Sequence, residues 1–499
     1  MSVYNLGKNR MLCWDDFFVD KQKSIEIRQH KPEKKNKILE GSKLWEGNYG
    51  SYNSIVKTPE GKYRFYYRTQ GGNIEYLPDG KVVAGTHGRY CVAESSDGKN
   101  FKRMPINKHE FNGSTRNNIY LNQGRDNVAV IYDENPNCPE NERYKALAMG
   151  NKEHYPDDNG GHGLYLFVSG NGIDFENRGR LDIPGSFDSY NIMFWDKESE
   201  TYHFYYRSEY HTEGFKIDFD IVKKERGIFR TINHSTTKDL VHFEHHGEIN
   251  YGDIHVPVQF YTNNIVKYYR AKDMFIGIPT RYIDRWESPE NFKQMPNSEL
   301  HEIREKFHGR AGTVVTDCAL LTSRDGYNFN KWEEAYLTGG IEGSGNWFYG
   351  DCYVCYGLYE TESDTEGEPN EISFIVPSKD VLGISEWWRY ATRLDGFISW
   401  YSKFNGGNGG EILTKPFTFE GSELEINFSS SAMGDMTITV CDEAGNELDG
   451  YKSCRIFGDS VDRKVDFEKK LKDLNGKPVR LKIALRDCDL YSFKFNNKQ

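Results

Sequence analysis

The sequence predicts an all-β protein, and three observations lead to that fold class. Aromatic residues make up 14% of the 499 residues, with 33 Tyr and 30 Phe, and such enrichment is typical of strands. A short phrase with the chemistry of a hairpin turn occurs four times along the chain. After residue 393, glycine-rich turns alternate with strands of alternating polarity. We therefore expect two β-rich units in succession.

The repeated phrase has four versions, each of which begins at a serine and closes on a phenylalanine. They read SSDGKNF, SGNGIDF, STTKDLVHF and SRDGYNF, and they begin at Ser95, Ser169, Ser235 and Ser323 and close on Phe101, Phe175, Phe243 and Phe329. Ser and Asx side chains cap tight turns, and glycine accepts the positive φ that such turns need. Each phrase therefore predicts a hairpin whose final Phe opens a new strand.

A second phrase precedes each hairpin and completes a structural unit. It reads GKYRFYYR, ERYKALAMG, ETYHFYYR and KDMFIGIPTRY, and each copy follows an apolar strand and a turn. The unit is then a four-stranded blade of a β-propeller. A fifth, more degenerate unit runs from NWFYGDCYVCYGLYETES to SEWWRYATRL. The sequence therefore predicts five blades, with one short helix at NSELHEIREKFHG in an insertion.

The predicted organisation has three parts. Residues 1–39 add one or two strands that pack on the propeller or close it, residues 40–392 form the five-bladed β-propeller, and residues 393–499 form a C-terminal β-sandwich domain. The repeats are longer than those of binding-type propellers. Their extra length is expected in loops, and long loops on a rigid scaffold usually serve a site.

Composition excludes several classes of function. The formal net charge of −11 and the pI near 5.8 provide no basic footprint for nucleic acid. The sequence has no apolar run long enough to span a membrane, and its start lacks the apolar region of a secretory signal. We therefore expect a cytoplasmic protein, or a secreted one if a signal peptide has been removed. The nine cysteines follow no framework spacing, so reduced thiols are expected.

The predicted propeller, its hairpins and the sandwich resemble the glycoside hydrolases of families 32 and 43, which cleave fructans and arabinans or xylans. The resemblance implies three catalytic carboxylates, one from the innermost strand of each of the first three blades. GRDNVAVIYD resembles the family's Arg-Asp-Pro motif, with Arg125 and Asp126 in place and Asn127 where Pro is usual. Asp126 then corresponds to the transition-state stabiliser. Asp188 in FDSYNIMFWD stands where the family has its general acid, more often a Glu.

The first blade departs from the family pattern, because its inner strand GSYNSIVK carries no acid. The nearest acid is Glu46, assigned here as base or nucleophile, with Asp351 before the fifth inner strand in reserve. Cleavage of a glycosidic bond needs one protonated carboxyl and one ionised carboxylate. Tyr190 is expected to desolvate Asp188 and keep it protonated. The alternative for Asp126 and Asp188 is turn capping before their strands.

Further side chains are expected to bind the substrate. Flat aromatic rings stack on sugars and arginine forks bind anionic groups, although the same residues can instead pack the core or pair within the fold. The expected binding residues are Trp45, Tyr52, Arg125, Tyr190, His255, Arg270 and Trp347. No metal ligand and no cofactor is predicted, and only the resemblance allows a structural calcium ion at the propeller centre.

These residues predict a glycoside hydrolase that cleaves a plant or microbial oligosaccharide, such as a furanoside, by paired-carboxylate catalysis in the propeller funnel. Two alternatives stay open. One is a non-catalytic glycan-binding propeller, for which the missing acid in the first blade is natural. The other is a glycoside phosphorylase or an enzyme of anionic sugars, which would require arginines to converge, namely Arg68, Arg125, Arg207 and Arg270. The expected partner is a carbohydrate, and the oligomeric state is unknown.

Overall fold

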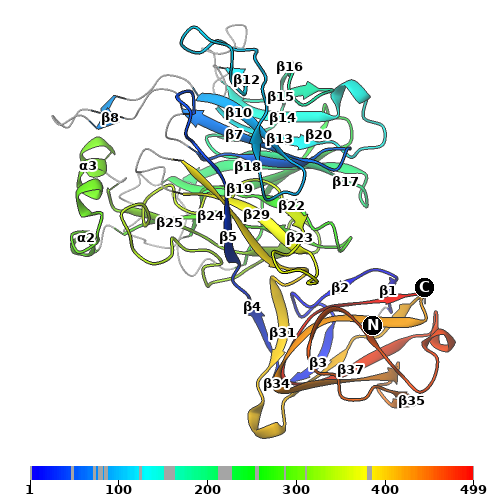
Figure 1. The fold of residues 1–499 in the computed structure, drawn as a ribbon. Coiled ribbons are helices and arrows are strands. Elements are labelled where there is room, and N and C mark those ends of the chain that lie inside the picture. Colours follow the sequence, from blue (N-terminus) through cyan, green and yellow to red (C-terminus); the bar gives the residue numbers. More distant parts are fainter. Residues whose placement is uncertain are drawn as a thin grey trace.

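The computed structural model in Figure 1 describes residues 3–46, 50–70, 75–76, 82–83, 88–122, 126–150, 163–211, 228–252, 258–285, 288–308, 312–378 and 385–497. Strands dominate, and the α-helices among these residues are α2 (Pro289–Phe292) and α3 (Ser298–His308). The predicted all-β class is confirmed, and α3 confirms the helix expected at NSELHEIREKFHG. None of the helices in the described ranges is long and apolar enough to cross a membrane.

Four sheets each take their strands from one stretch of the chain, in sequence order. The first contains β6 (Ser54–Lys57), β7 (Tyr63–Gln70), β10 (Gly88–Ser95) and β11 (Lys102–Arg103), with β12 (Ile119–Asn122) also paired to β10. The second contains β13 (Asp126–Tyr132), β14 (Tyr144–Gly150), β15 (Gly163–Ser169) and β16 (Glu176–Arg180). The third contains β17 (Ile192–Asp196), β18 (Thr201–His211), β19 (Ile228–Thr237) and β20 (Phe243–Glu248). The fourth contains β22 (Ile265–Lys267), β23 (Phe275–Gly277), β26 (Leu321–Ser323) and β27 (Phe329–Lys331).

Two smaller sheets lie in the insertions of these units. One contains β21 (Gln259–Phe260), β24 (Thr280–Asp284) and β25 (Val314–Cys318), and the other pairs β8 (Glu75–Tyr76) with β9 (Val82–Val83). Helices α2 and α3 connect β24 to β25. The fourth unit is therefore extended by a strand and helix insertion, drawn in green at the left of Figure 1.

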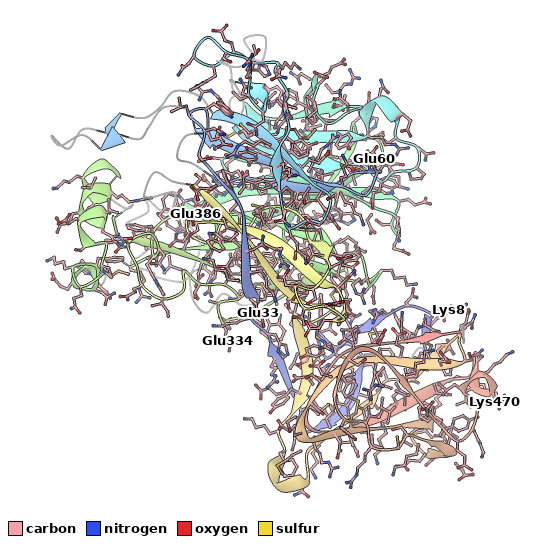
Figure 2. All side chains as sticks on the ribbon, in the orientation of Figure 1. Lys8, Glu33, Glu60, Glu334, Glu386 and Lys470 are labelled. Atoms are coloured by element: carbon pink, nitrogen blue, oxygen red, sulfur yellow. The ribbon has the colours of Figure 1, made fainter. Side chains whose placement is uncertain are left out.

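A fifth sheet combines strands from distant parts of the chain. It contains β28 (Tyr359–Thr361), β29 (Glu371–Ser378), β30 (Glu386–Arg393) and, as its outer strand, β5 (Glu33–Glu40). β5 runs antiparallel to β30, with Glu40 opposite Glu386, and Figure 2 labels Glu33 and Glu386 on these two strands. The N-terminal region therefore completes the last of the five sheets.

The remaining strands form one 11-stranded sheet, the terminal sheet. Its strands are β1 (Tyr4–Gly7), β2 (Met11–Leu12), β3 (Val19–Lys23), β4 (Glu26–Gln29), β31 (Ile398–Ser402), β32 (Gly410–Thr414), β33 (Phe417–Phe419), β34 (Glu423–Asp442), β35 (Glu447–Lys452), β36 (Asp459–Val465) and β37 (Val479–Asn496). They enclose a core that includes Trp400, Phe428 and Phe493. In Figure 1 this sheet is the lower part of the molecule and holds both chain ends. Residues 1–39 thus supply strands to both parts.

The four predicted turns share one hydrogen-bond pattern. In each turn a Ser or Thr hydroxyl accepts a hydrogen bond from the backbone N–H three residues later. The acceptor and donor residues are Ser95 and Gly98, Ser169 and Gly172, Thr237 and Leu240, and Ser323 and Gly326. The third turn therefore begins at Thr237, two residues later than the sequence phrase suggests. It also uses Leu240 at φ 63° where the others use glycine.

Three of these turns contact the preceding sheet in the same way, through a tyrosine hydroxyl that donates to the carbonyl of the turn glycine. The pairs are Tyr66 with Gly172, Tyr205 with Gly326, and Tyr359 with Gly98. The first pair joins the first and second sheets, and the second pair joins the third and fourth. The third pair joins the fifth sheet to the first. The last sheet therefore contacts the first one in the same way as earlier sheets contact their successors.

A single cavity of about 410 Å³ is lined by the five sheets at the ends of their first strands. Its walls include Lys57 of β6, Tyr132 of β13, Trp195 of β17, Lys267 of β22 and Glu360 of β28. Strands that are far apart in the sequence thus end around one space. The opposite ends of the same strands meet at the candidate site described below.

A row of stacked aromatic rings crosses the third sheet and contains two buried histidines. Phe194 stacks on His203, which stacks on His234, and the two imidazoles share a 3.0 Å hydrogen bond. Burial lowers the pKa of His203 to about 4 and lowers that of His234 as well. Both side chains are therefore neutral in the folded protein at pH 7.

In the unfolded chain these two histidines bind protons near pH 6.5, whereas in the folded protein they stay neutral to a lower pH. The free energy of unfolding should therefore fall as the pH drops from about 6.5 toward 4. We expect each of the two histidines to contribute a loss on the order of 1–2 kcal/mol between pH 7 and pH 5, and His203→Phe to remove the share of His203. Urea unfolding at the two pH values measures it, with the exposed His242→Gln as control. An unchanged pH dependence in His203→Phe would contradict the assignment.

Candidate functional site

Each of the five sheets has a residue in the left-handed region of backbone space within or ahead of its first strand. These residues, named here the rim, are Tyr52 (φ 62°), Asn127 (φ 56°), Phe187 (φ 56°), Asn264 (φ 46°) and Cys352 (φ 59°). Positive φ is uncommon outside glycine, and it is a genuine outlier for bulky side chains. Strained residues of this kind cluster at functional sites. The rim is therefore the candidate site.

Tyrosine rings pack together at the rim, with Tyr261 at their centre. Its ring centroid lies 5.7 Å from Tyr282, 5.5 Å from Tyr349 and 5.6 Å from Tyr353. Tyr52 joins them through Tyr353, at 5.9 Å. Tyr52 precedes the first sheet, Tyr261 the fourth and Tyr353 the fifth. This tyrosine cluster brings three distant parts of the chain to one place.

Guanidinium groups lie over the same cluster. Arg207 of β18 is 4.5 Å from the Tyr261 ring centroid, and Arg230 of β19 is 4.8 Å from that of Tyr282. Arg68 of β7 lies 5.8 Å from the Tyr52 centroid. Arg207 also donates to the Tyr261 carbonyl at 2.6 Å, while its buried Nε meets no acceptor among the residues that the structure describes. Arginine forks near aromatic faces are suited to anionic groups.

A repeated asparagine fixes two of these arginines. The side-chain oxygen of Asn53 accepts a hydrogen bond from the Arg68 backbone N–H at 2.8 Å, and Asn191 does the same for Arg207 at 3.0 Å. Both asparagines end the phrase Ser-Tyr-Asn, and both arginines end the phrase Phe-Tyr-Tyr-Arg. Sequence reasoning used the second phrase and missed the first, although the pairing of the two was the available signal.

The predicted acids of the second, third and fifth units lie at the rim, each in a different setting. Asp188 is exposed and has no partner among the described residues, between Phe187 and Ser189. Asp126 begins β13, where its backbone pairs with Met149 beside a bulge. Asp351 is partly buried and accepts a hydrogen bond from the Phe348 N–H at 2.9 Å.

Tyr190 does not provide the expected desolvation of Asp188. Its ring is buried, and its hydroxyl donates to the Asn53 carbonyl and shares a hydrogen bond with Ser54. Tyr190 therefore fastens the third sheet to the first, while the Asp188 carboxyl faces solvent.

Glu46 is fully buried in an ion pair. Its carboxylate accepts hydrogen bonds from Arg103 Nε and Nη2 at 2.6 and 2.7 Å, from the Tyr67 hydroxyl at 2.7 Å and from the Lys43 N–H at 3.0 Å. These donors occupy both oxygens. The geometry is that of a carboxylate that fixes the segment before β6 to β7 and β11.

Glu46→Gln is expected to lower the free energy of unfolding by about 2 kcal/mol, because Arg103 then loses its counter-charge in a partly buried site. Chemical denaturation measures the loss. Glu40→Gln is the matched control, since Glu40 pairs with Lys37 at the surface and should cost under about 1 kcal/mol. Unchanged stability together with lost turnover would instead return Glu46 to a catalytic role.

The other predicted binding residues are dispersed. Trp45 donates its indole N–H to Asn118 at 2.7 Å, near Glu46. Arg270 pairs with Asp395 at 2.7 Å, on the turn after β22 and at the opposite end of the sheets from the rim. Arg125 and His255 lie outside the described residues. Of the four arginines whose convergence was considered, Arg68 and Arg207 lie at the tyrosine cluster.

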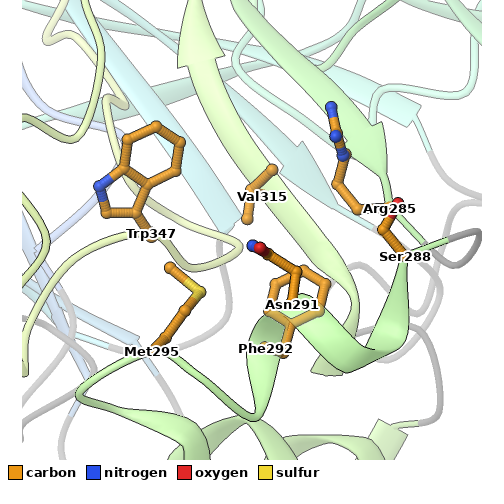
Figure 3. A pocket seen from close by; sticks show the side chains of 7 residues that line it. All are labelled: Arg285, Ser288, Asn291, Phe292, Met295, Val315 and Trp347. Atoms are coloured by element: carbon orange, nitrogen blue, oxygen red, sulfur yellow. The ribbon is translucent and has the colours of Figure 1, made fainter.

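Trp347 lines a small cavity of about 150 Å³. Figure 3 shows its indole ring on one side, Asn291 and Phe292 of α2 on another, and Val315 of β25 between them. Trp347 is itself left-handed, at φ 66°, and donates its indole N–H to the Gly340 carbonyl at 2.9 Å. Tyr349, two residues later, belongs to the tyrosine cluster. Trp347 and the tyrosine cluster are therefore linked through one short segment of the chain.

No group of three or more His, Cys, Asp or Glu side chains in the described ranges is arranged to hold a metal ion. No protein-family model matches the sequence, and no curated protein matches it.

Solved structures of carbohydrate-active proteins resemble the chain. An N-acetylgalactosamine deacetylase from F. plautii, in complex with blood group B trisaccharide, has a TM-score of 0.39 and 11% identity, covering 96% of this chain and 95% of its own. A β-1,2-mannobiose phosphorylase from Listeria innocua has a TM-score of 0.42 and 11% identity, over 74% and 96%. A glycoside hydrolase has a TM-score of 0.44 and 9% identity, over 73% and 93%. At these TM-scores and identities the likeness carries no argument about this chain.

Proposed function

We propose that the five consecutive sheets form a five-bladed β-propeller, and that the chain is a carbohydrate-active enzyme that cleaves a glycosidic bond at the rim. The cyclic order of contacts between sheets and the cavity that all five line support the propeller. In this arrangement β5 is the outer strand that closes the ring. The rim then surrounds one mouth of the central channel.

The observation that carries the enzymatic proposal is the exposed Asp188 carboxyl on a strained rim, beside the tyrosine cluster. An acid without a structural partner in the described part of the chain is free to meet a ligand, and the Ser189 hydroxyl beside it donates to Tyr261. In the proposed mechanism Asp188 protonates the leaving oxygen. Asp126 is the ionised carboxylate, with Asp351 as the further candidate. The proposal leaves Glu46 out of this set, because its buried carboxylate is paired with Arg103.

Arg207 and Arg230 favour a second candidate, an enzyme of anionic sugars or a glycoside phosphorylase. Both guanidinium groups lie against rings of the tyrosine cluster. A guanidinium fork held there is suited to a sugar carboxylate or to phosphate. The two candidates share the rim as their site and differ in the group that the arginines receive.

Product analysis on a panel of neutral and acidic oligosaccharides, with and without inorganic phosphate, tests the proposal. Reducing-sugar release without phosphate supports hydrolysis, and a sugar 1-phosphate that forms only with phosphate supports phosphorolysis. Binding without product across the panel would support a glycan-binding propeller and reject the enzyme.

A further inference from the structure

A third cavity, of about 530 Å³, lies between the five sheets and the terminal sheet. Glu134, Trp195, Lys267 and Tyr269 line both this cavity and the one at the ends of the inner strands. The two cavities therefore adjoin, at the opposite end of the strands from the rim. We name the larger one the junction cavity. Its volume lies in the range of small-molecule sites.

Cationic side chains dominate the junction cavity. Seven Lys or Arg residues line it against three carboxylates, although the chain as a whole carries a formal net charge of −11. Four of the seven are neutralised in ion pairs, with Arg10 and Arg270 on Asp395, Lys267 on Asp196 and Lys494 on Glu425. Those pairs hold the walls in place.

The other three cations are Lys8, Lys197 and Lys272. All are exposed, and none has an ion-pair partner among the described residues. They come from the terminal sheet, from the turn after β17 and from the turn after β22, so two parts of the protein contribute cations to this cavity, where Glu134 and Glu198 are the carboxylates outside the cited ion pairs. Figure 2 labels Lys8 at the upper edge of the terminal sheet, facing the five sheets. Converging lysines of this kind attract an anionic group.

Two aromatic residues complete the junction cavity. The Trp195 indole N–H is buried and donates to no group in the described part of the chain, while its ring packs on Tyr202 at 4.8 Å. Tyr269 lines the cavity and is half exposed to solvent. A flat exposed ring stacks on a sugar face, and a lone N–H donor is satisfied by a hydroxyl or ring oxygen.

We propose that the junction cavity is a second carbohydrate site, which binds a saccharide bearing a carboxylate or phosphate group. The anionic group lies among Lys8, Lys197 and Lys272, the sugar ring stacks on Tyr269, and Trp195 donates to a sugar oxygen. This site is separate from the rim, so the inference does not depend on the proposed enzymatic activity.

Calorimetric titration of the full chain tests the site with four probes: trigalacturonate, glucose 6-phosphate, inorganic phosphate and neutral maltotriose. We expect an acidic saccharide to bind and maltotriose not to bind. The double variant Lys8→Glu with Lys272→Glu should weaken that binding by about tenfold or more, because repulsion replaces attraction. Trp195→Phe should weaken it while keeping the ring that packs on Tyr202.

Lys477→Glu, an exposed lysine on the terminal sheet side, is the matched control and should bind within about twofold of the original chain. Asp188→Asn should bind the acidic probe unchanged, which separates this site from the rim. An equal loss in Lys477→Glu, or no acidic saccharide bound, would overturn the proposal. Inorganic phosphate that binds as tightly as glucose 6-phosphate would overturn the assignment of a saccharide.

Discussion

Asp188→Asn should lower turnover by about 10²–10⁴-fold, the contribution typical of a positioned acid or base, and leave thermal stability nearly unchanged. Asn has almost the same shape as Asp but cannot deliver the proton. The side chain is exposed and has no partner among the described residues, so its replacement disturbs no contact within the fold. Turnover on the substrate found by the oligosaccharide panel, and a melting curve, measure the two effects.

Asp182→Asn is the matched control, because Asp182 is an exposed acid of the same segment between β16 and β17. It should keep both turnover and stability. If Asp188→Asn keeps its activity, Asp188 is not the acid. Equal losses in both variants would indicate a general effect of charge at the rim instead.

Asp395→Asn should lower the free energy of unfolding by about 3–5 kcal/mol, the cost of leaving a buried cation without its partner. The Asp395 carboxylate is fully buried and meets Arg10 at 3.1 Å, Arg270 at 2.7 Å and the Tyr268 hydroxyl at 2.6 Å. Burial alone would raise the pKa of Asp395, but Arg10 and Arg270 lower it below its usual value. The residue therefore stays ionised at neutral pH.

Asn isolates the charge in this experiment, because Asp395 has φ 58° and Asn tolerates the left-handed conformation. Scanning calorimetry measures the change. Asp459→Asn is the control, since Asp459 is an exposed partner of Arg393 and should cost under about 1 kcal/mol. Arg10 comes from the terminal sheet region and Arg270 from the turn after β22 of the fourth sheet. Equal stability of both variants would show that Asp395 does not stabilise the contact between these two parts.

The repeated turns were predictable because their chemistry is local. Ser95 and Gly98 stand three residues apart, and the hydrogen bond between them depends on that spacing alone. β5 could not be assigned to the fifth sheet in this way, because its pairing with β30 joins segments that are distant in sequence and lack a shared turn. The sequence indicated strands in residues 1–39 but could not divide them between two sheets.

The site shows the same limit. Glu46 looks like a loop acid until Arg103, 57 residues later in the chain, is seen to bind it. Arg270 follows Tyr-Tyr just as Arg68 and Arg207 do, yet it lies on a turn rather than within a strand, and so it meets Asp395. The left-handed backbone at Tyr52 and Phe187 also could not be predicted, because bulky residues have no preference for positive φ that a sequence would show.

The pairing of β5 with β30 determines when the fifth sheet can be completed during synthesis of the protein. A ribosome makes β5 early, and its partner emerges only after the five sheets are otherwise complete. In the nascent chain β5 therefore lacks its partner strand β30 for most of the synthesis. Lys34, Lys35 and Lys37 lie on that strand, and lysines are among the side chains by which unpaired strands avoid pairing with other chains.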